Sequence, residues 1–321
     1  MQFGILSTAN IGDESVVPAI EATDHEVRAV ASRDADAAAD YAERHGIPES
    51  YDSYDALLDA DVDAVYVPLP NALHAEWTKR AADAGLHVLC EKPLAADAEE
   101  AVDVVEHCAD AGVTLMEAFM YRYHPRTVRA LDVARDELGD LRHVHAAFSF
   151  PLPQGPDVRV DPDLAGGALM DVGCYAVSAA RQFLGEPALA AATTHDGRDC
   201  GVDTQVSGTF EFEDGATATI EAGFETRVHQ TYRVEGTNGW LEAENAYNPG
   251  VEETVLRWGT DEKTVEERFD AVDAYRLEVE EFAAAVDAGR DPLTDGEEAV
   301  ANMRAIDALY ESDATGETVP L

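Results

Sequence analysis

The chain has 321 residues, 46% of them hydrophobic, and its 65 acidic and 22 basic side chains give a formal net charge of −43. A chain of this length can form two domains, each with its own core. The negative charge repels nucleic acids and anionic lipid surfaces, so neither is expected as a partner. Because acidic residues alternate with apolar ones from end to end, disorder is excluded as well. We expect a halophilic protein, adapted to molar salt, where the screening length falls to about 3 Å.

Cysteine usage and hydropathy indicate the compartment. The four cysteines show no Cys-x-x-Cys spacing and are too few for a disulfide scaffold, so we expect reduced and mostly buried thiols at Cys90, Cys108, Cys174 and Cys200. No apolar run reaches the roughly 18 residues of a membrane span, and no leader pattern precedes the first strand. We therefore expect a cytoplasmic protein without membrane contact.

The first third of the chain alternates short apolar runs with helical patterns. The apolar runs predict strands over residues 2–6, 26–31, 64–67, 88–90 and 113–117. The helical patterns end at glycines, which favour the left-handed conformation found at helix C-termini: Gly46, Gly85 and Gly112. Strands that alternate with helices predict βαβ units, and hence an α/β dinucleotide-binding Rossmann domain with a doubly wound parallel sheet over residues 1–118.

The pattern changes in residues 119–321. Helices are predicted over residues 125–138, 171–184, 272–286 and 300–310. Two runs that alternate polar and apolar residues flank Asp214-Gly215, a strong hairpin signal, and further strands pass through Trp258 and Val265. We predict a C-terminal α+β domain with a large, mainly antiparallel open sheet, which would bind substrate. Its last helix is expected to pack back on the first domain.

The turn after the first predicted strand is a candidate phosphate cradle. A helix N-terminus with unpaired amides attracts anions, and the usual dinucleotide-binding motif is GxGxxG. In this chain the motif is reduced to its third glycine, with small residues in place of the other two. An ordinary strand–helix turn is the alternative. The candidate cofactor-binding residues are Ser7, Thr8, Ala9, Asn10, Ile11 and Gly12.

The end of the second predicted strand indicates which nucleotide binds. A carboxylate at this position selects NAD, whereas a cation selects NADP. The chain has Ser32 and Arg33 there, a hydroxyl and a guanidinium suited to a phosphate, while Asp34 is expected to cap the next helix. We predict NADP as cofactor, with NAD as the alternative. Arg33 as an ordinary solvated side chain is the competing interpretation.

The motif Glu91-Lys92-Pro93 follows a buried strand, where open α/β sheets bind their ligands. The whole chain has only three lysines against nineteen arginines, so a lysine at this position points to chemistry. A surface ion pair between Glu91 and Lys92 is the alternative.

In the second half, Asp171 and Tyr175 are four residues apart on a predicted helix and therefore share a face. A tyrosine is a competent acid/base group when a nearby cation lowers its pKa, and Lys92 would supply that cation if the two domains close on each other. The alternative is a helix cap at Asp171 and a core tyrosine at Tyr175.

His143 and His145 alternate on a strand but lack a third ligand, so we expect them to be structural and expect no metal.

Five segments of the chain form a characteristic set: GILSTANIG, VPLPNALHAEW, AGLHVLCEKPLA, EAFMYRYHP and GGALMDVGCY. Together they resemble one family, the Gfo/Idh/MocA oxidoreductases, named for glucose–fructose oxidoreductase and inositol dehydrogenase. The resemblance is strongest to the branch that contains dimeric dihydrodiol dehydrogenases and NADP-linked D-xylose dehydrogenases.

The resemblance implies roles for individual residues. The catalytic lysine of the family falls on Lys92, its carboxylate on Asp171 and its acid/base residue on Tyr175. By the same resemblance, further cofactor-binding positions are Pro70, Asn71, His74 and Glu91, and further substrate-binding positions are Arg122 and His124. A homo-oligomer formed through the C-terminal sheet is also implied.

We therefore predict an NADP-dependent dehydrogenase that oxidises an aldose such as xylose or glucose at C1 to the lactone. A trans-dihydrodiol, an inositol or another polyol is the alternative substrate. A non-catalytic NADP-binding sensor is the alternative of a different class.

Overall fold

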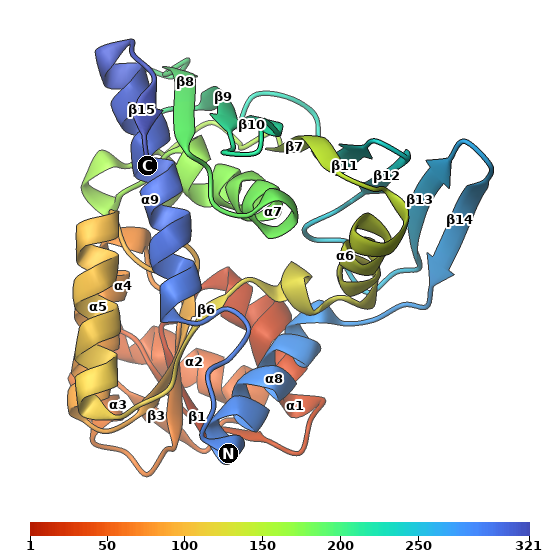
Figure 1. Ribbon diagram of the computed structural model, residues 1–321. Helices are drawn as coiled ribbons and strands as arrows, with labels where there is room; N and C mark the ends of the chain where they lie inside the picture. Colours follow the sequence, from red (N-terminus) through yellow and green to blue (C-terminus); the bar gives the residue numbers. More distant parts are fainter. The chain divides into compact units, whose positions relative to one another are not determined.

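The computed structural model describes residues 1–321 and forms two compact units (Figure 1). The first unit comprises residues 1–120 and 273–300, and the second comprises residues 121–272 and 301–321. The segment Asp273–Val300, which the expected boundary at residue 118 assigns to the second domain, thus packs with the first unit. That boundary stays a prediction about which parts of the chain fold independently.

The first unit contains a parallel sheet of six strands in the order β3-β2-β1-β4-β5-β6. The chain reverses its direction of strand addition between β1 and β4, as in a doubly wound fold, which confirms the predicted Rossmann architecture. The strands are β1 (Gln2–Leu6), β2 (Glu26–Ala31), β3 (Glu49–Tyr51), β4 (Ala64–Val67), β5 (His87–Glu91) and β6 (Leu115–Ala118).

Helices flank this sheet, and several begin and end at residues expected from sequence. Asp34 accepts backbone hydrogen bonds at the start of α2, and Gly46 ends that helix with φ of 67°. Asp97 and Gly112 do the same for α5. The helices are α1 (Val17–Glu21), α2 (Ala35–His45), α3 (Tyr54–Leu58), α4 (His74–Asp83), α5 (Ala98–Ala111) and α8 (Ala274–Ala288), with a π-helical turn η1 (Gly12–Val16) before α1.

The core of the first unit forms from residues far apart in the chain. The rings of Phe3 on β1 and Phe282 on α8 have centroids 6.0 Å apart, and both side chains are fully buried. Helix α8 thereby covers apolar surface that residues 1–120 alone would expose to water, which explains why it packs with this unit.

The second unit contains a sheet of nine strands in the order β14-β13-β12-β11-β7-β10-β9-β8-β15. Every pair is antiparallel except β7 with β10, so the predicted mainly antiparallel sheet is confirmed. The strands are β7 (Leu141–Ser149), β8 (Leu189–His195), β9 (Gln205–Glu211), β10 (Thr217–Gly223), β11 (His229–Gly236), β12 (Gly239–Glu244), β13 (Thr254–Thr260), β14 (Thr264–Phe269) and β15 (Val319–Pro320).

Two helices of this unit pack on its sheet: α6 (Pro125–Glu137) contacts β12 and β13, and α7 (Cys174–Leu184) lies on β7 and β10 (Figure 1). A π-helical turn, η6 (Leu169–Gly173), leads directly into α7. Helix α9 (Gly296–Thr315) begins among the residues of the first unit and ends among those of the second. Short 3-10 turns are η2 (Asn71–Leu73), η3 (Met120–Tyr123), η4 (Val158–Val160) and η5 (Pro162–Leu164).

No helix in the chain combines the length and the apolar character that crossing a membrane requires. All four cysteines are free thiols, and Cys90, Cys108 and Cys174 are buried.

Candidate active site

The turn after β1 has a backbone conformation that normally requires glycine. Ser7 adopts φ of 138°, which is unfavourable for a residue with a side chain. Its hydroxyl offsets this cost, because it accepts a hydrogen bond from the Ala9 amide at 2.9 Å and donates one to the Pro68 carbonyl at 3.2 Å. Ser7 therefore replaces the first motif glycine with a cross-link between the turn and the loop after β4.

The third motif position keeps glycine because there is no room for a side chain. A Cβ atom on Gly12 would lie 2.9 Å from the hydroxyl of Tyr41, a buried oxygen without a hydrogen-bond partner. The helical segment that starts there has no side-chain cap, so its first amides can donate hydrogen bonds to an anionic ligand. Thr8, Asn10 and Ile11 lie in this turn, with Asn10 exposed. The turn thus fits the pyrophosphate of a dinucleotide.

The end of β2 presents the predicted cationic group to solvent. Arg33 is exposed. Ser32 is buried, and its hydroxyl accepts a hydrogen bond from the amide of Asp34 at 3.2 Å. Burial raises the pKa of Tyr54, and the charge of Arg33 opposes this shift. An exposed guanidinium fits a phosphate ligand, and no carboxylate takes its place.

Three contacts hold the backbone around Lys92. Glu91 accepts a hydrogen bond from Tyr66 at 2.6 Å. Burial is the main cause that raises the pKa of Tyr66, and the charge of Glu91 raises it further. The carbonyl of Pro93 lies 2.7 Å from Nδ1 of His74. The Leu94 amide donates to the buried carboxylate of Glu117 at 2.8 Å. These supports act on the residues beside Lys92 and use none of the atoms of its ammonium group.

His74 connects two loops of the first unit. The side chain is completely buried, and its second ring nitrogen, Nε2, lies 2.7 Å from the carbonyl of Leu69. Burial lowers the pKa of His74 to about 4, and the charge of Lys92 lowers it further. As a neutral imidazole the side chain donates through only one of the two ring nitrogens, either to the Leu69 carbonyl or to the Pro93 carbonyl. The part of His74 in cofactor binding stays a prediction.

In the second unit, Asp171 and Tyr175 lie on the continuous helical segment formed by η6 and α7. The start of this segment is capped by Asp203, which accepts a hydrogen bond from the Leu169 amide at 2.8 Å and another from the Tyr310 hydroxyl at 2.7 Å. Asp171 therefore does not cap the helix, and its side chain stays 18% exposed. The helix-cap interpretation of Asp171 is therefore wrong, and its role at the site stays a prediction.

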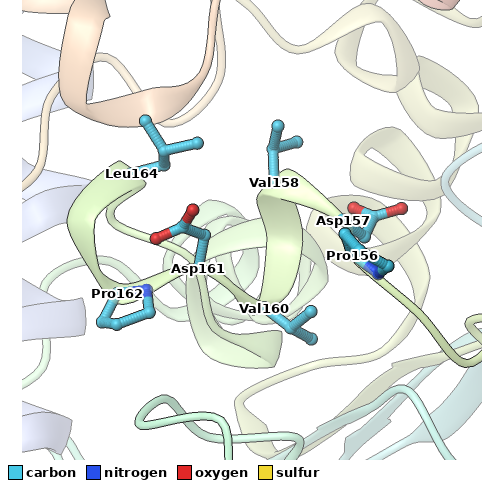
Figure 2. Close-up of a pocket in the computed structure, with 7 residues that line it drawn as sticks. All are labelled: Pro156, Asp157, Val158, Val160, Asp161, Pro162 and Leu164. Carbon is cyan, nitrogen blue, oxygen red and sulfur yellow. The ribbon is translucent and has the colours of Figure 1, made fainter.

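Arg159 is a partner of Asp171 that the sequence did not reveal. Its Nε donates to Asp171 at 3.1 Å, and its Nη1 donates to Asp157 at 3.2 Å. Burial disfavours the charge of this guanidinium, but the two carboxylates outweigh burial and raise its pKa. Arg159 belongs to the segment 151–165, which also forms a hollow of about 390 Å³; Figure 2 shows its lining residues Pro156, Asp157, Val158, Val160, Asp161, Pro162 and Leu164.

Tyr175 packs within a cluster of aromatic side chains. Its ring centroid lies 5.4 Å from that of Phe148, 5.5 Å from that of Tyr247 and 5.8 Å from that of Tyr121. Tyr121 and Tyr247 are fully buried, whereas Tyr175 retains 5% exposure. The cluster is therefore a packing wall that fixes the phenol ring in one orientation.

The remaining predicted residues of the second unit are less accessible than expected. His124 is 1% exposed and starts α6, where its Nδ1 accepts a hydrogen bond from the Arg126 amide at 3.1 Å. Burial lowers the pKa of His124 to about 4. Arg122 lies on η3 and is 8% exposed. Substrate binding by these two residues stays a prediction.

His143 and His145 lie on β7 and contact threonines of β10. Each Nδ1 is 2.9 Å from a threonine hydroxyl, Thr217 for His143 and Thr219 for His145. No group of three or more His, Cys, Asp or Glu side chains in the chain is arranged to hold a metal ion.

Several supporting residues escaped sequence analysis. Tyr66 lies within an apolar strand, so nothing in the sequence indicates that its hydroxyl has a hydrogen-bond partner. Glu117 lies near the end of a strand, where a solvent-exposed acidic residue is equally common. The only available signal was the position of Glu117 at the C-terminal end of a buried strand, the edge where parallel sheets collect functional side chains. Arg159 precedes Asp171 by twelve residues in a segment without periodicity, so nothing in the sequence links the two.

Comparisons with known proteins agree with this geometry. Residues 1–119 match an oxidoreductase family described as having an NAD-binding Rossmann fold, and residues 126–242 match the GFO/IDH/MocA C-terminal domain. The chain is 57% identical to a protein named D-xylose 1-dehydrogenase (NADP(+)) 2 from Haloferax volcanii, with full coverage of both chains.

Two solved structures are similar over nearly the whole chain. A 3-ketoreductase from Actinomadura kijaniata, in complex with NADP and TDP-benzene, is 33% identical, with a TM-score of 0.92 and 97% coverage of each chain. The aldose-aldose oxidoreductase from Caulobacter crescentus is 29% identical, with a TM-score of 0.93 and coverage of 100% of this chain and 99% of that chain. The chain therefore belongs to the GFO/IDH/MocA oxidoreductase family.

Proposed function

We propose that the protein is an NADP-dependent dehydrogenase that oxidises an aldose, D-xylose or a similar sugar, at C1. The observation that carries this proposal is the pairing of a partly exposed carboxylate, Asp171, with an ordered tyrosine, Tyr175, on one helix, in a chain that also has a phosphate-binding turn. The relative from Haloferax volcanii is named for its action on D-xylose with NADP⁺, which supports the choice of sugar and of cofactor.

Each residue has a distinct role in the proposed reaction. Tyr175 removes the proton from the anomeric hydroxyl. Lys92 donates a hydrogen bond to the same oxygen, and its charge favours the ionised phenol, so that a group with an ordinary pKa near 10 can act as a base. Asp171 accepts hydrogen bonds from the sugar hydroxyls and orients C1. NADP, when bound, supplies nicotinamide C4 as the hydride acceptor, and the sugar becomes a lactone.

This mechanism requires that Lys92 of the first unit and Tyr175 of the second act on one substrate molecule. Charge stabilisation by a fixed ammonium group then replaces that by a metal ion. We further propose that the cofactor is held by the turn Ser7–Gly12, with Arg33 on the 2′-phosphate and the Pro70–Asn71 loop near the nicotinamide.

The polarity near Asp171 favours a sugar over an aromatic diol. The aromatic rings next to Tyr175 are buried behind it, whereas the more accessible groups are the charged side chains of Asp171 and Arg159. Such groups recognise hydroxyls by hydrogen bonding and gain nothing from a flat apolar ring.

A substrate screen tests the proposal. The protein would be incubated at molar salt with NADP⁺ and, separately, D-xylose, D-glucose, an inositol and a trans-dihydrodiol, and the absorbance of the reduced nicotinamide would be followed. We expect the highest kcat/KM with an aldose. Preference for the diol or the inositol would refute the substrate, and NADP⁺ binding without turnover of any compound would support a non-catalytic sensor instead.

We also propose that the protein is cytoplasmic and forms a homo-oligomer through the nine-stranded sheet. The four free thiols support a reducing compartment. Light scattering at molar salt measures the oligomeric state, and a monomeric mass would contradict this assembly.

A further inference from the structure

We infer that Arg159 is a positioning residue that holds the carboxylate of Asp171 in its substrate-binding orientation. This inference rests on the proposed function, since it assigns Asp171 to the sugar, and it adds a residue that neither the sequence motifs nor the named relatives identify. The supporting observations all lie within the second unit.

The first observation is the geometry of the contact. The guanidinium of Arg159 bridges two carboxylates, with Nε on Asp171 and Nη1 on Asp157. Asp157 is itself fixed, because it accepts a hydrogen bond from the backbone amide of Arg159 at 2.9 Å and thereby caps η4. A planar guanidinium with two anchored contacts fixes the direction of its N–H groups better than a flexible ammonium would. Asp171 is thus given a defined rotamer by a partner that is itself held.

The second observation is that the backbone of Arg159 is built into the start of the same helix. The Arg159 carbonyl accepts a hydrogen bond from the Gly167 amide at 2.8 Å. A Cβ atom on Gly166 would lie 2.6 Å from this carbonyl oxygen, so only glycine allows the approach. The Gly166-Gly167 pair thereby brings the segment 151–165 against the helix that carries Asp171. Arg159 is thus held against this helix both by its side chain, through Asp171, and by its backbone, through Gly167.

The third observation concerns the donors that remain. Arg159 has five N–H groups, and its hydrogen bonds to the two carboxylates use Nε and Nη1. The side chain is 43% exposed, so the Nη2 group is available to a sugar hydroxyl that also contacts Asp171. Arg159 is thereby expected to orient the carboxylate in the free protein and to contribute to hydroxyl recognition in the complex.

A matched control distinguishes this role from simple support of the segment. Arg198 donates to the carbonyls of Leu152 at 2.6 Å and Pro153 at 3.1 Å, so it anchors the beginning of the same segment. None of the contacts of Arg198 is with Asp171. If Arg159 only supports the segment, Arg198→Gln and Arg159→Gln should have similar effects. If Arg159 acts through Asp171, only Arg159→Gln should depend on that carboxylate.

The test is a double-mutant cycle on the substrate with the highest turnover in the screen. Because the carboxylate that Arg159 orients contacts the substrate, Arg159→Gln should raise KM about tenfold and change kcat by less than about threefold. Arg159→Lys, which keeps the charge but loses the bridge, should give an intermediate KM. In an Asp171→Asn background, Arg159→Gln should raise KM by less than about threefold, because the carboxylate that it positions is gone and only the contact of Nη2 with the sugar is left to lose.

Where Asp171→Asn turns over too slowly for kinetics, the same cycle is measured as binding of 1,5-anhydroxylitol, which lacks the anomeric hydroxyl, in the presence of saturating NADP⁺. The inference would be overturned if the effects of Arg159→Gln and Asp171→Asn on KM or on analogue binding multiply in the double variant. It would also be overturned if Arg198→Gln has the same effects as Arg159→Gln. Turnover by the unmodified protein together with such results would leave the proposed function standing. Absence of turnover by the unmodified protein would contradict both.

Discussion

Arg33 at the end of β2 provides a sharp test of cofactor selection. Its guanidinium is exposed, and its charge counteracts the rise in the pKa of Tyr54 that burial causes. In Arg33→Gln, the hydrogen bonds of the guanidinium to the 2′-phosphate are lost, while the phosphate turn at Ser7–Gly12 is untouched. The change should therefore weaken the binding of NADPH and leave the binding of NADH largely unchanged.

The magnitude follows from the exposure of the site. A hydrogen bond to a charged group contributes about 1.5–3 kcal/mol, and molar salt screens the long-range part of the attraction between exposed charges. We expect a net loss of about 2 kcal/mol, which corresponds to a roughly 30-fold rise in the Kd of NADPH, with the Kd of NADH changed by less than about threefold.

Titration of nicotinamide fluorescence at molar salt measures both constants. The control is Arg28→Gln on the same strand. Because Arg28 is paired with Glu49 at 2.6 Å, this substitution should leave the Kd of NADPH and the Kd of NADH unchanged. Equal weakening of NADPH and NADH by Arg33→Gln, or no weakening of either, would refute the assignment of Arg33 to the 2′-phosphate.

Three further predictions concern the turn, a buried histidine and salt. Since the Ser7 hydroxyl offsets an unfavourable φ, Ser7→Ala should raise the Kd of NADPH about tenfold whereas Ser7→Gly should change it little; equal effects in the same titration would contradict this. His74 has a pKa of about 4 when folded and about 6.5 when unfolded, so its stabilising contribution is present above pH 6.5 and is lost as the pH falls toward 4. His74→Gln should thus reduce the loss of unfolding free energy between pH 7 and 4.5 by about 2–3 kcal/mol, measured by urea unfolding of both proteins, and an unchanged loss would exclude a buried neutral imidazole. With a net charge of −43, dilution from molar to about 0.1 M salt should cost structure or activity, measured by circular dichroism and turnover, and full activity at low salt would count against halophilic adaptation.

The fold of the first unit could be predicted because each level of the sequence agrees with it. The strand runs are apolar on both faces, as buried parallel strands are, and the helices end at glycines that adopt positive φ. The strand β3 and the helix α3 were missed, since Glu49–Tyr51 is only partly buried and Tyr54–Leu58 is too short to show a period. Local pattern also gave no sign that α8 belongs with the first unit, because its partner Phe3 lies near the other end of the chain.

The candidate site was predictable in residue type and less so in environment. Motif positions such as Lys92, Asp171 and Tyr175 stand out in the sequence by spacing and scarcity. Whether a histidine lies at a surface or in a core depends on neighbours from distant segments, so the burial of His74 and His124 was not foreseen. For the same reason, the contact of Arg159 with Asp171 could not be predicted from the sequence.

The claim that Lys92 and Tyr175 act on one substrate is tested most directly by a double-mutant cycle on turnover. Lys92→Met and Tyr175→Phe should each lower kcat about 10³-fold while the Kd of NADPH stays the same, because the ammonium group and the phenol act as one unit. The double variant should then be about as slow as either single variant, since residues that act as a unit are strongly non-additive. Effects that multiply, with a double variant about 10⁶-fold slower, or a single variant that turns over at the original rate, would contradict the account.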